Sequence, residues 1–229
     1  MKAKRIIFVT GTDTGVGKTL LTALLLHHLR QAGVHALAMK PFCSGGLADV
    51  RLLQSLQTGE LSDREMNPYL FKQPIAPFVV TKKTRKNIPL SEVVDRIKRV
   101  EKQCDRLIIE GSGGLLVPLG KGYTVASLIA RLDCRVIVVA RNRLGTINHT
   151  LLTMEHLQSI GFRRSELTVT LMSGRNPDLS SRDNQSTLAE LVEPATVWSI
   201  PFFGSQATAS AGKIQKSYSQ IRKTLAEIV

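Results

Sequence analysis

The residues with the clearest chemical signature form a glycine-rich run near the start of the sequence. Gly-Thr-Asp-Thr-Gly-Val-Gly-Lys-Thr, residues 11–19, follows the apolar run 5–9 and opens a helical pattern of apolar residues over 18–31. Glycines let backbone N–H groups turn toward a phosphate, and the start of a helix adds partial positive charge. The Lys18 ammonium can then reach the β- and γ-phosphates of a nucleotide, and the Thr19 hydroxyl can ligate Mg²⁺. The run therefore predicts a phosphate-binding loop.

The spacing of this run departs from the usual Gly-x4-Gly-Lys-[Ser/Thr] pattern at one position. Thr12 stands where the first glycine belongs, and Gly11 leaves five residues before Gly17. The apolar strand before the run and the helix after it still favour nucleotide binding. The sequence has no Asn-Lys-x-Asp motif, which reads guanine, so we expect ATP rather than GTP.

Three charged residues follow other predicted strands. Lys40 begins a polar run after one strand, and Asp49 lies on a helical stretch further along. Glu110 ends another strand and opens the run Gly-Ser-Gly-Gly, residues 111–114. Ligands of open α/β sheets bind outside the carboxyl ends of the strands, so we expect all three side chains to converge on the phosphates. Simpler roles remain open, namely a surface lysine, a helix-start aspartate and a structural glutamate.

The elements that must position these residues alternate between strands and helices. The predicted strands are 5–9, 35–39, 106–110, 134–140, 167–172 and 197–200. The predicted helices are 18–31, 91–103, 124–132, 147–160, 184–192 and 213–228. Near-continuous Val and Ile runs indicate strands buried on both faces, and crossover helices favour a parallel arrangement. We expect an α/β fold of the P-loop NTPase type, with a doubly wound, mostly parallel sheet in a single domain over 1–229. Residues 67–87 show no sustained period and are interpreted as a structured loop.

Length and composition limit the class of protein. The chain has 229 residues, 43% of them hydrophobic, which suits one globular core. No apolar run approaches the roughly 18 residues that span a bilayer, and the N-terminus lacks the pattern of a signal peptide. The three cysteines are widely spaced, which favours reduced thiols in the cytoplasm and no zinc site. The net charge of +13 suits either a nucleic-acid binder or an enzyme with anionic ligands.

Four motifs, taken together, resemble one known family. They are the run 11–19, Lys-Pro-x-x-Ser-Gly at 40–45, Glu-Gly-Ser-Gly-Gly at 110–114 and Leu-Gly-Thr-Ile-Asn-His at 144–149. In this order they are similar to the motifs of the dethiobiotin synthetases, and Asn-Pro-Tyr at 67–69 with the proline-rich stretch after it fits as well. The unusual glycine spacing is a variant of that family.

The resemblance implies an ATP- and Mg²⁺-dependent ligase of biotin biosynthesis. Its substrates would be 7,8-diaminononanoate and CO₂. One amine would carry CO₂ as a carbamate, which attacks the γ-phosphate of ATP. The second amine would then close on the mixed carbamic–phosphoric anhydride to give the cyclic urea of dethiobiotin. Such chemistry needs positioning and charge neutralisation more than a strong base.

The resemblance also implies roles for individual residues. The catalytic residues would be Lys40, which holds the carbamate, with Lys18 and Thr14 at the γ-phosphate. The Mg²⁺ ligands would be Thr19, Asp49 and Glu110. The nucleotide would contact Gly15, Val16, Gly17, Lys18, Thr19, Leu20, Asp49, Glu110, Gly111, Ser112, Gly113, Ser173 and Pro201. The substrate would contact Ser44, Gly114, Val117, Gly145, Thr146, Ile147 and Asn148.

The last of these positions imply a homodimer. In the family, the helix start equivalent to 145–148 comes from the partner subunit and receives the substrate carboxylate. Free N–H groups at a helix start suit that role, although plain N-capping by Thr146 or Asn148 is the simpler alternative. His149 is interpreted as a packing or capping residue rather than a catalyst.

Nucleotide preference and two other functions stay open. The family usually has Asn after the strand 167–172, where it reads adenine, whereas this chain has Ser173, with Asn176 three residues on. A related P-loop amide-forming enzyme of the cobyrinate amidase type is one alternative. A ParA-like DNA-partitioning ATPase is another, and the basic charge would suit it, but Asp13 stands where such proteins usually carry a second lysine. We therefore expect no nucleic acid and no membrane among the partners.

Overall fold

The centre of the molecule is a parallel sheet with six strands. The computed structural model describes residues 4–229. The strands of the sheet are β1 (Ile6–Gly11), β2 (Ala36–Met39), β5 (Arg106–Gly114), β8 (Cys134–Asn142), β9 (Leu167–Ser173) and β10 (Thr196–Ile200). Their order is β10-β9-β8-β1-β5-β2, and every neighbouring pair is parallel. The predicted doubly wound α/β fold is confirmed.

The strands form where the sequence places unbroken apolar runs. Val136, Val138, Val139 and Ala140 of β8 are fully buried, because helices cover this strand on both faces. In β1, Phe8 pairs in register with Val136 on one side. Burial on both faces explains why these strands show no alternation of polar and apolar residues.

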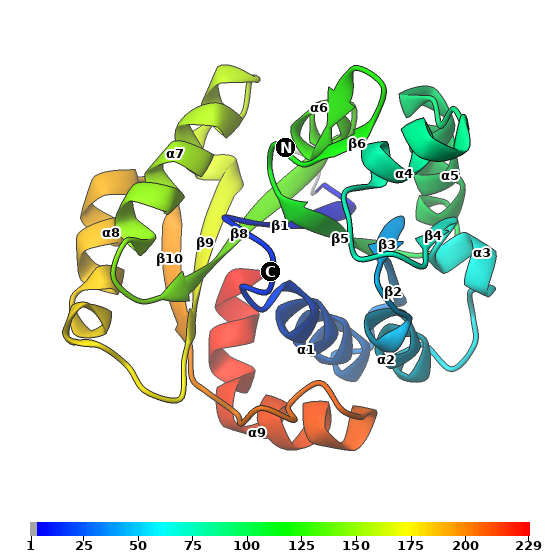
Figure 1. Ribbon diagram of the computed structural model, residues 1–229. Coiled ribbons are helices and arrows are strands. Elements are labelled where there is room, and N and C mark those ends of the chain that lie inside the picture. Colours follow the sequence, from blue (N-terminus) through cyan, green and yellow to red (C-terminus); the bar gives the residue numbers. More distant parts are fainter. Residues whose placement is uncertain (1–3) are drawn as a thin grey trace.

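Helices cover both faces of the sheet (Figure 1). On one side lie α1 (Lys18–Gln31), α2 (Ala48–Leu56) and α9 (Ala211–Ile228). On the other side lie α5 (Leu90–Glu101), α6 (Val125–Ile129), α7 (Thr146–Ser159) and α8 (Asn184–Val192). Right-handed crossovers produce this division, because the chain moves outward from β1 in one direction through α1 and returns in the other. The six predicted helices are thus all present, with ends shifted by up to three residues.

The segment between β2 and β5 differs from its prediction. Instead of a loop over 67–87, the structure has a strand β4 (Tyr69–Phe71) and a helix α4 (Pro77–Thr84), after the short elements β3 (Phe42–Ser44) and α3 (Asp63–Met66). β3 and β4 form a separate parallel pair. Three-residue strands carry no readable period, and Pro77 occupies the first position of α4, where its missing N–H costs nothing.

The remaining elements are short and peripheral. β6 (Pro118–Gly120) pairs antiparallel with β7 (Tyr123–Thr124), and the 3₁₀ turns are Arg164–Glu166 and Leu179–Arg182. The three cysteines are unpaired and buried. Within residues 4–229, no helix is long and apolar enough to cross a membrane.

Candidate active site

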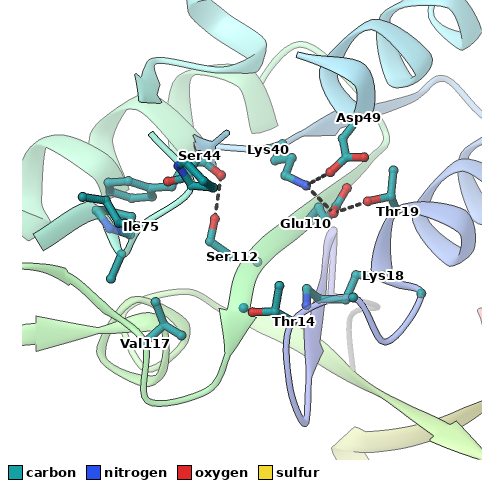
Figure 2. A pocket seen from close by; sticks show the side chains of 18 of the residues that line it. Thr14, Lys18, Thr19, Lys40, Ser44, Asp49, Ile75, Glu110, Ser112 and Val117 are labelled. Atoms are coloured by element: carbon teal, nitrogen blue, oxygen red, sulfur yellow. Dashed lines mark hydrogen bonds and ion pairs between the residues drawn. The ribbon is translucent and has the colours of Figure 1, made fainter. Parts of the chain in front are cut away.

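A cavity of about 560 Å³ opens where β1, β2 and β5 end (Figure 2). Because parallel strands end at the same edge of the sheet, residues far apart in the sequence meet there. Residues from five segments line the cavity, namely Thr14, Gly15, Gly17, Lys18, Thr19 and Leu20; Lys40, Phe42, Ser44 and Asp49; Pro74 to Pro77; Glu110 to Gly113 with Val117; and Thr208. The structure places Lys40, Asp49 and Glu110 together beside the phosphate loop.

The phosphate loop joins β1 to α1 in the predicted manner. Gly17 caps the helix in the left-handed region at φ 108°, and a Cβ there would lie 2.9 Å from Met172, so only glycine fits. Lys18 Nζ donates to the Asp13 carbonyl at 2.9 Å. Burial lowers the pKa of Lys18 to about 8, although the Glu110 carboxylate opposes this shift.

Lys40 stands at the centre of a buried charge cluster. Its Nζ donates to Glu110 Oε1 at 2.7 Å and forms an ion pair with Asp49. Thr19 Oγ1 donates to the same Glu110 Oε1, also at 2.7 Å. Burial alone would lower the pKa of Lys40, but the carboxylates of Glu110 and Asp49 outweigh it and raise that pKa above its ordinary value. Lys40 is therefore a fixed cation over the whole physiological pH range.

The backbone of Lys40 is held from the β3–β4 side. Its N–H donates to the Met66 carbonyl at 3.0 Å, and its own carbonyl accepts from Asn67 Nδ2 at 2.5 Å. Asn67 is buried, so this bond is shielded from water. The Asn-Pro-Tyr motif thus positions the lysine rather than touching the cavity itself.

Glu110 carries an oxygen that suits a cation. Its side chain is 1% exposed, and Oε2 has no hydrogen-bond partner within the described residues. With the Thr19 hydroxyl and the half-exposed Asp49 carboxylate nearby, the donor set is all oxygen, which Mg²⁺ prefers. Residues 4–229 contain no cluster of three or more His, Cys, Asp or Glu side chains, so water or phosphate oxygens would have to complete the coordination.

Comparisons with known proteins agree on one family. A family model described as an AAA domain matches residues 5–201. The ATP-dependent dethiobiotin synthetase BioD of Bacillus licheniformis is 39% identical over 187 residues, which cover 76% of this chain and 80% of that protein. The protein of the same name from Methanococcus vannielii is 40% identical over 156 residues, which cover 68% of this chain and 74% of that protein. The chain belongs to the dethiobiotin synthetase family.

Solved structures show how widely the fold of this dethiobiotin synthetase family member is shared. The MinC:MinD cell division protein complex of Aquifex aeolicus superposes with a TM-score of 0.64 at 14% identity, covering 98% of this chain and 95% of the other. A structure of pNOB8 ParA bound to nonspecific DNA gives 0.59 at 12% identity, covering 98% of both. At such identities the likeness shows the fold alone.

Several predicted contact residues do not line the cavity. Val16 of the phosphate loop and Gly114, the last residue of β5, are not among the lining residues. Neither are Ser173, the last residue of β9, and Pro201, which follows β10. The α7 start, residues 145–148, also lies outside. It borders a small hollow with Arg141 and Arg143, where the buried Thr146 hydroxyl has no hydrogen-bond partner in the described chain.

Other lining residues were not predicted from the sequence. Pro74 to Pro77 form one wall, and a Cβ on Gly45 would lie 2.8 Å from Pro74, so the two segments touch closely. The proline-rich stretch is evident in the sequence, but proline fixes the backbone φ and does not indicate which way the segment faces. Thr208 comes from an irregular turn before α9, for which the sequence offered no signal.

Proposed function

We propose that the chain is an ATP- and Mg²⁺-dependent dethiobiotin synthase, which joins 7,8-diaminononanoate and CO₂ into a cyclic urea. The observation that carries this proposal is the placement of Lys40. A permanently charged ammonium and the phosphate loop line the same cavity, and Lys40 and Thr19 both donate to Glu110 Oε1. This placement suits a reaction that brings an anionic carbamate to a nucleotide.

The residues of the cavity would bind two anions, the triphosphate of the nucleotide and the carbamate of the substrate. Lys18 and the N–H groups of residues 15–19 would hold the triphosphate and stabilise its transferring γ-phosphoryl group. Lys40 would hold the carbamate, whose oxygen attacks the γ-phosphorus while ADP leaves. The second amine of the substrate would then attack the carbamoyl carbon, phosphate would leave with the C–O bond electrons, and the amine would release its proton.

Magnesium would be held by Glu110, Asp49 and Thr19. It would neutralise charge on the phosphates and orient them. Glu110 and Asp49 are the carboxylates that pair with Lys40. A divalent cation on these oxygens would compete with the ammonium, so that Lys40 would turn toward the carbamate.

The substrate carboxylate would bind the α7 start of a partner subunit in a homodimer. Leu144, beside that helix start, is 80% exposed, and an exposed leucine at this place suits an interface. Thr14, Ser44 and Val117 line the cavity of the same subunit and would contact the reacting end. Gly145 and Asn148, from the partner, would contact the tail.

Nucleotide preference and location are also part of the proposal. Ser173 and Pro201 would border the base, and a serine hydroxyl reads adenine less fully than an asparagine amide does. We therefore expect ATP with tolerance for other nucleoside triphosphates. The buried free cysteines are compatible with the cytoplasm, which stays a prediction.

The test follows phosphate and dethiobiotin together. Purified chain, Mg²⁺-ATP and bicarbonate are incubated with and without 7,8-diaminononanoate. We expect phosphate release that depends on the diamine and equals the dethiobiotin formed. Absence of diamine-dependent phosphate release at saturating ATP would refute the ligase proposal. ATP-dependent DNA binding that resists salt would favour a ParA-like activity instead.

A further inference from the structure

One arginine outside the cavity is bonded to the phosphate loop. Arg141 lies near the end of β8, and its guanidinium is exposed. It donates two hydrogen bonds to the Gly15 carbonyl, from Nη2 at 2.9 Å and from Nε at 3.2 Å. Nothing in the proposed reaction assigns a role to this side chain.

The same strand holds the loop at a second point. The Thr12 N–H donates to the Val139 carbonyl at 2.9 Å, two residues before Arg141. The start and the middle of the loop are thus both fastened to β8. By contrast, the N–H groups of residues 15–19 donate to no backbone carbonyl within residues 4–229, so they are free for a ligand.

The geometry of the Gly15–Val16 peptide bond relates the Arg141 contact to the direction of the Val16 N–H. The Gly15 carbonyl and the Val16 N–H belong to the same planar trans peptide and point in opposite directions. Gly15 adopts φ +69°, a conformation that its neighbours must maintain. Because Arg141 holds the carbonyl, the Val16 N–H of the same peptide points away from the guanidinium.

We propose that Arg141 is a positioning residue for the nucleotide, which fixes the Gly15–Val16 peptide so that the Val16 N–H faces the phosphates. This inference rests on the proposed nucleotide binding. Because the guanidinium is a fork, it can hold one carbonyl with two donors, which an ammonium cannot do with the same geometry.

A neighbouring arginine separates this role from simple charge attraction. Arg143 borders the same hollow as Arg141, together with Thr12 and Asp13. Its side chain makes no hydrogen bond to any part of the described chain. Both arginines bring positive charge near the loop, but only Arg141 holds it.

The experiment measures nucleotide affinity directly. ATP and ADP are titrated calorimetrically into the full chain and into the variants Arg141→Ala, Arg141→Lys and Arg143→Ala, without the diamine. We expect Arg141→Ala to weaken both nucleotides about tenfold, the value of one hydrogen bond from a charged donor. Arg141→Lys should recover part of the loss, and Arg143→Ala should bind like the parent. In turnover, KM for ATP should rise while kcat and the unfolding midpoint stay unchanged.

Three results would overturn the inference. They are an ATP affinity of Arg141→Ala equal to that of the parent, equal losses of affinity in Arg141→Ala and Arg143→Ala, and a loss of kcat in Arg141→Ala at unchanged affinity. A parent chain that binds no ATP would refute it as well. A chain that binds ATP and shows the Arg141 effect, yet never responds to the diamine, would refute only the ligase proposal.

Discussion

At the scale of single residues, the pKa values of the two cavity lysines are shifted in opposite directions. Two carboxylates raise the pKa of Lys40, whereas burial lowers the pKa of Lys18 to about 8. Two neighbouring ammonium groups repel each other unless carboxylates or phosphates balance their charge. This difference leads to separate predictions for the two side chains.

Replacement of Lys40 should separate binding from turnover. Lys40→Gln removes the ammonium that would hold the carbamate, and the loss should slow turnover at least about a hundredfold, as for other groups that stabilise a developing anion. ATP affinity should stay within about threefold, because Lys18 and the loop remain. Lys102→Gln, at an exposed position directly after α5, is the matched control. Abolished ATP binding in Lys40→Gln would contradict the role given to this lysine.

Nucleotide binding should draw a proton onto Lys18. Its pKa is lowered to about 8 by burial, so above pH 8 more than half of the free protein carries Lys18 neutral. Phosphates favour the charged form and raise this pKa, so ATP binding near pH 8.5 should take up protons. Stability of the protein without nucleotide should rise between pH 8 and the ordinary pKa, because folding favours the neutral form. Calorimetry in buffers of different ionisation enthalpy measures the uptake, and Lys18→Arg, which stays charged, should show none.

At the scale of elements, α1 connects the loop chemistry to the core. Its N-terminus follows the phosphate loop, while Leu24 near its middle is fully buried. Leu24→Ala should therefore lower the free energy of unfolding by about 2–5 kcal/mol, measured by urea denaturation at one protein concentration. Leu191→Ala, at a position 44% exposed on α8, should change it by less than about 0.5 kcal/mol. Equal effects of the two substitutions would show that α1 is not part of the core.

The elements also show how far sequence alone could predict the site. Long apolar runs such as β8 and the helix 18–31 were predictable, because burial on both faces leaves a continuous pattern. The meeting of the phosphate loop with Lys40 and Glu110 was predictable from the strands, since parallel strands end at the same edge of the sheet. β3, β4 and α4 were not predictable, because a strand of three residues has no period. The wall at Pro74 to Pro77 depends on how this segment folds back, which no local signal records.

At the scale of the whole molecule, a homodimer should contain composite sites. Lys40→Gln disables the reacting end of one subunit, and Asn148→Asp at the α7 start should repel the carboxylate of the partner's substrate. Each variant alone should be inactive or nearly so. After random exchange of subunits, half the dimers should be mixed and each should keep one intact site, so activity should recover to about a quarter of the parent value. No recovery, with exchange verified, would place each site within one subunit.

The segment between β2 and β5 has a consequence for how such an enzyme can diversify. β2 and β5 are adjacent in the sheet, so the segment leaves and returns at neighbouring points. It carries Lys40, Ser44, Asp49 and the proline wall, whereas the phosphate loop joins β1 to α1 and Glu110 belongs to β5. The segment between β2 and β5 thus supplies one side of the cavity, and the loop after β1 together with Glu110 supplies the other. Insertions there that leave Lys40 and Asp49 in place would reshape the wall at Pro74 to Pro77 without changing the phosphate loop or Glu110.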